Sequence, residues 1–188
     1  MLASIPSVRW LADLCGVPPV DHFPCLASAL LDDVRFADPI VAYVGWWIRH
    51  PSPGSHFEAA TGHLKEMTDS PLVATLLTLG YDGLIYQHAG EIVGHVFFQR
   101  HGADLCAFSS SVDERYRGGE LWATFSFDFV AYASQLADVT RARLGGGNHP
   151  ITRGLVARLI PHVARLGWQV SRDGWIDFFA KEGRPHAR

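Results

Sequence analysis

Three consecutive runs of strand-forming residues constrain the fold of this chain more than any other feature. The segment from Leu84 to Val112 is rich in β-branched and aromatic residues, and it is interrupted at Ala89-Gly90 and at Gly102. Short interruptions of this kind are typical of hairpin turns. The sequence therefore predicts three antiparallel strands over Leu84–His88, Glu91–Arg100 and Asp104–Val112.

The second of these runs is apolar on both faces, which is typical of a strand that is covered on both sides. With strict alternation, one face would carry Ile92, Val96 and Phe98, and the other would carry Val93, His95 and Phe97.

Helices are predicted on both sides of the meander. Asp38-Pro39 and Ser70-Pro71 each place a capping side chain before a proline, so we expect helices over 39–50 and 71–79. A shorter amphipathic helix is expected over 25–34. Apolar residues recur at helical spacing from Glu120 to Leu136.

The last third of the chain predicts a strand over 139–145, a helix from Pro150 to Gly167 that Pro161 should kink or split, and a hairpin around Asp173-Gly174. This order of elements favours a mixed α/β (α+β) fold with a central, mainly antiparallel sheet flanked by helices.

Length and composition favour a single domain. The chain has 188 residues, of which 48% are hydrophobic, enough for one sizeable core. We expect one domain over 1–188, with a helical or loop extension over 1–37 and a loose tail over 181–188.

The net charge of −3 indicates no sequence-wide basic field, so nucleic acid is not an expected partner. No long uncharged apolar run and no leader-like N-terminus are present, so we expect a cytoplasmic protein without a membrane partner.

Three stretches resemble the GCN5-related N-acetyltransferase (GNAT) superfamily: "GEIVGHVFF" (90–98), "VDERYRGG" (112–119) and "ARLGW" (164–168). Together with the element order they cover roughly residues 38–180. The resemblance implies a GNAT-like acyl-CoA N-acyltransferase fold in a single domain. It also implies that acetyl-CoA or another acyl-CoA is the co-substrate.

The resemblance places the cofactor-binding residues at Val112, Arg117, Gly118, Gly119 and Asn148. Main-chain N–H groups at a helix N-terminus bind phosphate well, and glycine permits close approach. The motif is altered here. Counted from Arg117, the glycine and small-residue positions of the motif fall on Glu120 and Trp122. Counted from Arg115, Gly118 fits the glycine position, but Glu120 occupies the small-residue position.

The family position for a proton-donating group is altered as well. The family's frequent tyrosine, four residues before the corner glycine, corresponds to Val163, with His162 beside it. Candidate bases on the strands are His95, Glu91, Asp104 and Cys106. We select His95 as the candidate catalytic residue, because apolar neighbours can shift its pKa, although a hydrogen-bonded core histidine is the commoner explanation.

Other groups admit simpler explanations. Cys15, His22 and Cys25 lack the spacing of a zinc site, so no metal is expected. Ser109, Ser110 and Ser111 are more typical of a bulge or a strand divergence than of a nucleophile. Tyr43, Trp46, Trp47 and Phe57 could line an apolar pocket or pack between helices.

The sequence therefore predicts acyl transfer from acyl-CoA to a small-molecule or peptide amine by direct attack. The alternative is a catalytically silent GNAT-fold module that binds a ligand or protein partner in the cleft. Whether the chain is an enzyme, and whether it forms a homodimer, the sequence leaves open.

Overall fold

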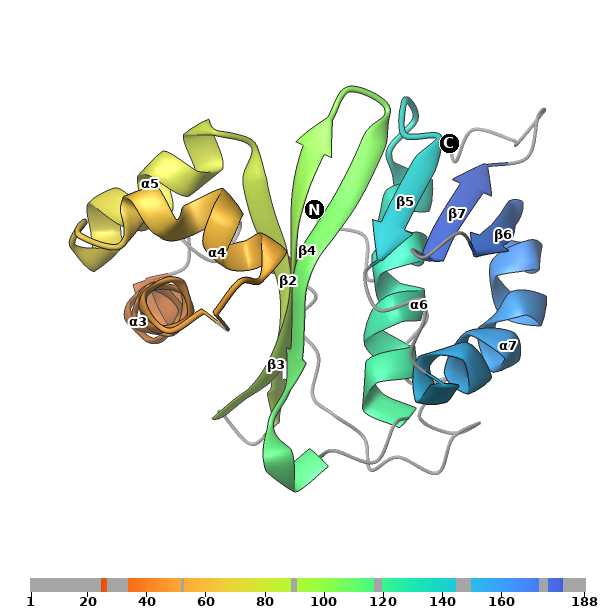
Figure 1. The fold of residues 1–188 in the computed structure, drawn as a ribbon, viewed down its shortest axis with the longest axis horizontal. Helices are drawn as coiled ribbons and strands as arrows, with labels where there is room; N and C mark the ends of the chain where they lie inside the picture. The colour runs from red at the N-terminus through yellow and green to blue at the C-terminus, as the bar shows by residue number, and fades with distance from the viewer. Residues whose placement is uncertain are drawn as a thin grey trace.

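A computed structural model describes residues 25–26, 34–51, 53–88, 91–116, 120–144, 150–172 and 176–180 of the chain (Figure 1). Its strands are β1 (Cys25–Leu26), β2 (Tyr81–His88), β3 (Glu91–His101), β4 (Asp104–Val112), β5 (Arg141–Leu144), β6 (Trp168–Arg172) and β7 (Ile176–Ala180). Its helices are α3 (Val34–Arg49), α4 (His56–Thr61), α5 (Asp69–Thr78), α6 (Glu120–Gln135) and α7 (Pro150–Arg165), with short 3₁₀ turns at Gly62–Leu64 and Glu114–Tyr116.

The seven strands form one sheet in the order β1-β2-β3-β4-β5-β7-β6. Every neighbouring pair is antiparallel except β4 and β5, which are parallel. This arrangement confirms the predicted mixed fold with a mainly antiparallel sheet. The predicted meander is confirmed as well, and β4 has the expected bounds.

Helices cover the sheet in two groups, each with its own apolar core. Helices α6 and α7 pack on one face, where Phe125, Phe129 and Trp168 are buried. Helices α3, α4 and α5 pack on the other face over β2 to β4, where Ile40, Leu72 and Phe97 are buried. Figure 1 shows these two groups on opposite sides of the β2–β4 region. The double cover explains the continuous burial from Val93 to Phe98.

The alternation predicted for β3 is wrong at one end because the strand is irregular there. Tyr86 pairs with Gly94, whereas Gln87 pairs with Ile92, so Val93 is an extra residue. A bulge of this kind shifts the side chains beyond it to the other face. Ile92 therefore packs with the α3–α5 core, and Val93 packs with the α6 core.

The helix starts predicted from proline are also corrected. Helix α3 begins at Val34 and contains Pro39, and α5 begins at Asp69 after Thr68. Pro71 still lies in the first turn of α5, where its missing N–H costs no ladder bond. Cys25 and Leu26, predicted to start a helix, instead pair with Ile85 and Leu84 as strand β1, because the edge of β2 offers them ladder hydrogen bonds.

The C-terminal elements follow the prediction more closely. Helix α7 is continuous through Pro161, so the proline does not divide it. Strands β6 and β7 pair as the predicted hairpin, with Arg172 opposite Ile176. Gly167 has φ = +79°, a conformation that favours glycine, at the corner between α7 and β6. In the described part of the chain, no helix has the length and apolar character to span a bilayer.

Candidate functional site

The divergence of the two parallel strands forms the centre of the candidate site. Strands β4 and β5 pair only from Asp104 to Cys106, and β4 then continues alone on that side to Val112. Figure 1 shows the strands together at their upper ends and separated below, with α6 in the gap between the ribbons. The backbone edge of β4 that faces β5 is therefore released from strand pairing beyond Cys106.

A bulge accompanies this divergence. Phe97 pairs with Ser109 and Phe98 pairs with Ala107, so Phe108 is the extra residue of β4. The sequence predicted that the three serines mark a bulge or the divergence, and they follow both directly. The bulge turns Ser109 toward His95 on the α3 side, while Ser110 contacts Trp122 of α6.

The N-terminal end of α6 lies below the part of β4 that is not paired with β5. Helix α6 begins at Glu120, as the helical spacing of its apolar residues predicted. The Trp122 indole N–H donates a hydrogen bond of 3.1 Å to the Ser110 hydroxyl. The indole thus links the first turn of α6 to β4. Arg117, Gly118, Gly119 and Asn148 lie outside the described residues, so their roles stay predictions.

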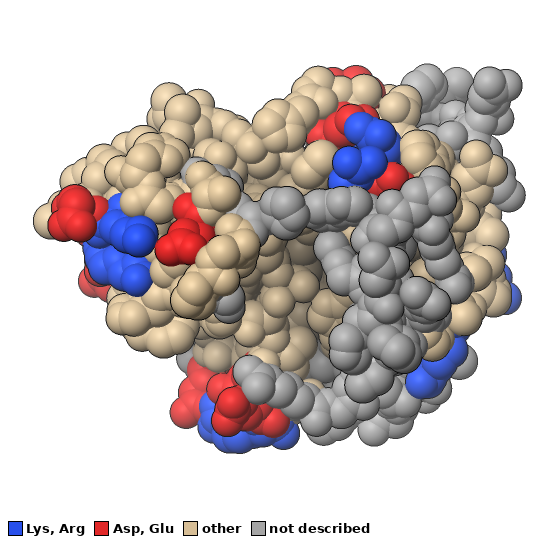
Figure 2. All heavy atoms as spheres, in the orientation of Figure 1, with Lys and Arg blue, Asp and Glu red and all other residues tan. Residues whose placement is uncertain are grey.

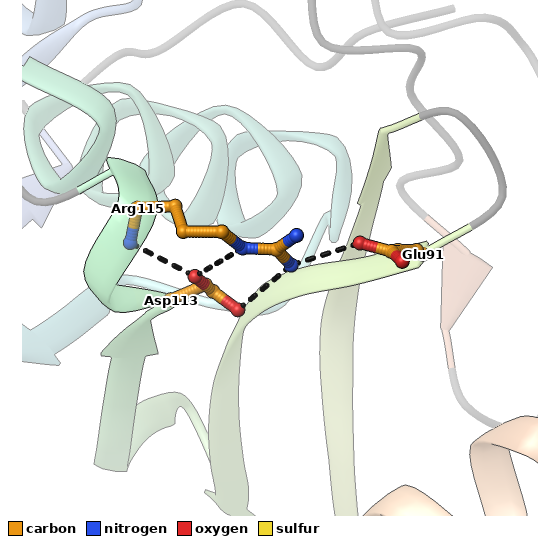
Figure 3. A network of polar contacts seen from close by, with 3 residues as sticks. All are labelled: Glu91, Asp113 and Arg115. Atoms are coloured by element: carbon orange, nitrogen blue, oxygen red, sulfur yellow. Dashed lines mark hydrogen bonds and ion pairs between the residues drawn. The ribbon is translucent and has the colours of Figure 1, made fainter.

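Arg115, one of the two arginines from which the motif can be counted, is held by carboxylates. Its guanidinium lies 2.8 Å from Glu91 and 3.0 Å from Asp113, and its main-chain N–H donates to the same Asp113 carboxylate (Figure 3). The side-chain hydrogen bonds with Asp113 and Glu91 raise the pKa of Arg115 above its usual value. The charge of Arg115 is already balanced by these two carboxylates. Arg117 is therefore the better candidate to bind a diphosphate.

His95 is fully buried and both of its ring nitrogens are hydrogen-bonded. Nδ1 lies 2.9 Å from the Tyr43 hydroxyl, and Nε2 lies 3.0 Å from the Ser109 hydroxyl. The ring stacks on Phe97 at a centroid distance of 3.9 Å. Burial lowers the pKa of His95 to about 3, so the imidazole is neutral at physiological pH. The sequence identified this residue, but its partner Tyr43, 52 residues away, was considered only as part of an aromatic cluster.

That aromatic cluster separates into three environments. Tyr43 and Trp47 surround His95, with Trp47 4.7 Å from its ring. Trp46 is 52% exposed and stacks on His50. Phe57 stacks instead on Phe108. Only part of the cluster therefore packs near the histidine.

The other candidate bases lie in ion pairs or beside them. Asp104 pairs with Arg141. Arg143 binds Asp177 through two hydrogen bonds of 2.6 and 2.9 Å. Burial, followed by the charge of Asp104, raises the pKa of the Cys106 thiol, so this cysteine is not activated as a thiolate. On the face shown in Figure 2, charged side chains of both signs gather in small mixed groups.

The region of the corner offers no tyrosine in the family position. Val163 is buried in the α6 core. His162 is half-buried with its ring perpendicular to that of Phe127, and partial burial lowers its pKa.

One buried polar pair was missed by the sequence analysis. Asp128 of α6 and Tyr86 of β2 are both fully buried. Burial raises the pKa of Tyr86 well above its usual value, and so does the nearby charge of Asp128. The available signal was an acidic residue inside the apolar run "FSFDFV" of α6.

Comparisons with known proteins found alignments to solved structures of low sequence identity. No protein-family model matches the chain, and no curated protein matches it. A Bacillus subtilis acetyltransferase solved in complex with CoA aligns at 12% identity and a TM-score of 0.41, over 60% of this chain and 83% of its own. A GNAT family acetyltransferase from Elizabethkingia anophelis with acetyl-CoA bound aligns at 12% identity and a TM-score of 0.40. That alignment covers 60% of this chain and 82% of the other.

A spermidine N-acetyltransferase from Vibrio cholerae, solved in complex with CoA and spermine, aligns at 8% identity and a TM-score of 0.47. That alignment covers 77% of this chain and 90% of the other.

Proposed function

We propose that this chain is a GNAT-fold acyltransferase that transfers an acetyl or longer acyl group from acyl-CoA to an amine. The observation that carries the proposal is the divergence of β4 from β5 after Cys106, above the start of α6 at Glu120. A released strand edge offers backbone hydrogen bonds to an extended ligand, and a helix N-terminus offers donors to its phosphates.

In this proposal the donor lies along β4 between Ala107 and Val112, on the side where β4 is no longer paired with β5. Arg117, Gly118 and Gly119 hold the diphosphate at the entrance of α6, and Asn148 contacts the cofactor from the start of α7. Backbone N–H groups near Val112 polarise the thioester carbonyl. Glu120 opposes a diphosphate by charge, so Arg117 has to offset it.

The proposed reaction is direct transfer. The neutral amine nitrogen attacks the thioester carbon, the C–N bond forms, the C–S bond breaks, and the thiolate leaves and takes up a proton. The attacking amine loses its proton to water or to a nearby side chain. A pKa of about 3 makes His95 a weak proton acceptor. We therefore propose that His95 is a positioning residue and does not accept the proton itself. Its hydrogen bond orients the Ser109 hydroxyl beside the β4 bulge.

The first prediction concerns binding of the donor. Arg117→Ala should weaken binding of acetyl-CoA by about tenfold or more, because it removes a charge-assisted contact to phosphate. Isothermal titration calorimetry measures the change. Arg158→Ala, on the exposed surface of α7, is the matched control and should leave binding unchanged. Flat titrations of the wild type with acetyl-CoA and with longer acyl-CoA donors would rule out the acyltransferase.

A second candidate function is a catalytically silent GNAT-fold module. The Trp122–Ser110 hydrogen bond favours it, because the indole lies between β4 and the helix entrance that the diphosphate would approach. The burial of His95, with both nitrogens bonded, favours it as well. Saturable acyl-CoA binding without release of CoA thiol across a panel of amines would support this second function.

The second prediction tests the effect of the indole. Trp122→Ala should raise the affinity for acetyl-CoA several-fold, because it opens the gap between α6 and β4. Trp122→Phe keeps a ring but lacks the N–H donor to Ser110, so it should show an intermediate affinity. Calorimetry gives the affinities, and thermal melting checks that each variant is folded. Weaker binding by both variants would mean that the indole contacts the donor instead of obstructing it.

A further inference from the structure

Three polar side chains on the α3 face of the sheet form a line of hydrogen bonds that ends at Ser109. Tyr43 and Trp47 lie one turn apart on α3, and both pack against the ring of His95. The Tyr43 hydroxyl lies 2.9 Å from Nδ1 of that ring, and the Ser109 hydroxyl lies 3.0 Å from Nε2. The buried imidazole is neutral, so only one of its nitrogens carries a proton. The ring therefore donates one of these hydrogen bonds and accepts the other.

The two hydroxyl groups differ in a way that decides which nitrogen carries the proton. A phenol is a stronger hydrogen-bond donor and a weaker acceptor than an aliphatic hydroxyl, because its lone pair is delocalised into the ring. Tyr43 is therefore the better donor to Nδ1, and Ser109 is the better acceptor from an Nε2–H group.

Trp47 favours the same direction. Burial raises the pKa of Tyr43, whereas hydrogen bonding with the Trp47 side chain lowers it. An indole offers only its N–H, so Trp47 donates and the Tyr43 oxygen accepts. The hydroxyl proton of Tyr43 is then left for Nδ1 of His95.

This direction leaves the hydroxyl proton of Ser109 available. Its oxygen accepts from His95, and among the described residues the Ser109 side chain has no second hydrogen-bond partner. Ser109 is half-buried, and it lies on the stretch of β4 that is no longer paired with β5. A hydroxyl whose oxygen is held in this way can direct its proton toward a ligand at that stretch.

We infer that Tyr43 and His95 hold Ser109 as a hydrogen-bond donor, and that the Ser109 hydroxyl binds a carbonyl oxygen of the acyl donor beside the β4 bulge. The contact with the donor rests on the proposed function, whereas the direction of the hydrogen bonds does not. Tyr43 and His95 are positioning residues. The same direction excludes Ser109 as a nucleophile activated by His95, because a protonated Nε2 cannot accept the proton that serine would lose.

Long-range proton–nitrogen correlation NMR on the full chain measures which ring nitrogen of His95 is protonated. The chain has ten histidines, so the signals that disappear in His95→Gln identify this one. At neutral pH we expect a proton on Nε2 and none on Nδ1. A proton on Nδ1 would overturn the inference, because the Ser109 hydroxyl would then donate to His95 and would have no proton for a ligand.

Calorimetry with acetyl-CoA tests the contact with the donor. Ser109→Ala should weaken binding about fivefold, a typical loss for one neutral hydrogen bond, whereas Ser109→Thr keeps the hydroxyl and should retain most of the affinity. His95→Gln should bind like the wild type, because its amide oxygen can accept from Tyr43 and its N–H can donate to Ser109. Ser134→Ala removes a hydroxyl near the far end of α6 and is the matched control, with unchanged binding.

Equal affinities of the wild type and Ser109→Ala would overturn the contact with the donor. An acetyl group on Ser109, found by peptide mass spectrometry after incubation with acetyl-CoA, would overturn it as well. Flat titrations of the wild type, together with a proton on Nε2, would refute the proposed acyl transfer and would still support Ser109 as a donor.

Discussion

His95 alone is expected to lower the free energy of unfolding by about 1.4 kcal/mol for each unit that the pH falls between 6.5 and about 3. In the unfolded chain the imidazole binds a proton near pH 6.5, whereas in the fully buried site its pKa is lowered to about 3. Between these values the unfolded state binds more protons than the folded state. The contribution of neutral His95 to the free energy of unfolding is therefore complete above pH 6.5, and it is lost progressively as the pH falls below that value.

Urea denaturation of the wild type and of His95→Gln at intervals from pH 8 to pH 4.5 measures this dependence. Glutamine retains hydrogen-bonding capacity toward Tyr43 and Ser109 but does not titrate. Carboxylates contribute equally to both proteins, so the difference between the two curves isolates the histidine. The curves should run parallel above pH 7 and converge as the pH falls. Parallel curves down to pH 4.5 would show that the buried imidazole is not the cause.

Phe125→Ala should lower the free energy of unfolding by about 3–5 kcal/mol, because it leaves a cavity in the α6 core. Phe125 is fully buried, and its ring stacks on that of Tyr86 at a centroid distance of 3.7 Å. A Cβ on Gly94 would lie 2.4 Å from its ring, so the glycine of the "GEIVGHVFF" motif is what admits this ring against β3.

Chemical denaturation of Phe125→Ala measures the loss, and Gln135→Ala, exposed at the end of the same helix, is the control. The control should change the free energy of unfolding by less than about 0.5 kcal/mol. A cost below 1 kcal/mol for Phe125→Ala would indicate that the α6 core collapses around the vacancy or is less tightly packed than the structure shows.

Much of the fold could be predicted from local signals. The bounds of β4, the hairpin of β6 and β7, and the glycine corner at Gly167 follow from side-chain periodicity and turn chemistry within a few residues. The starts of α3 and α5 were misplaced, because proline marks a first turn without specifying its first residue.

The candidate site could be predicted only in outline. The motif resemblance indicated the loop after Val112, and the burial of β3 indicated an unusual environment for His95. The side chains that contact that histidine, and the two carboxylates that hold Arg115, come from separate elements. Nothing in the local pattern of either residue specifies those partners.

The sequence by itself determined which segments become strands and helices, and which glycines form the turns, because these depend on neighbouring residues. Only the tertiary structure decided the extra residue at Val93, the placement of the β4 bulge at Phe108, the point after Cys106 where β4 leaves β5, and the burial of Asp128 and Tyr86. Each of these depends on register and packing between segments far apart in the chain, and a shift of one residue exchanges the faces of a strand.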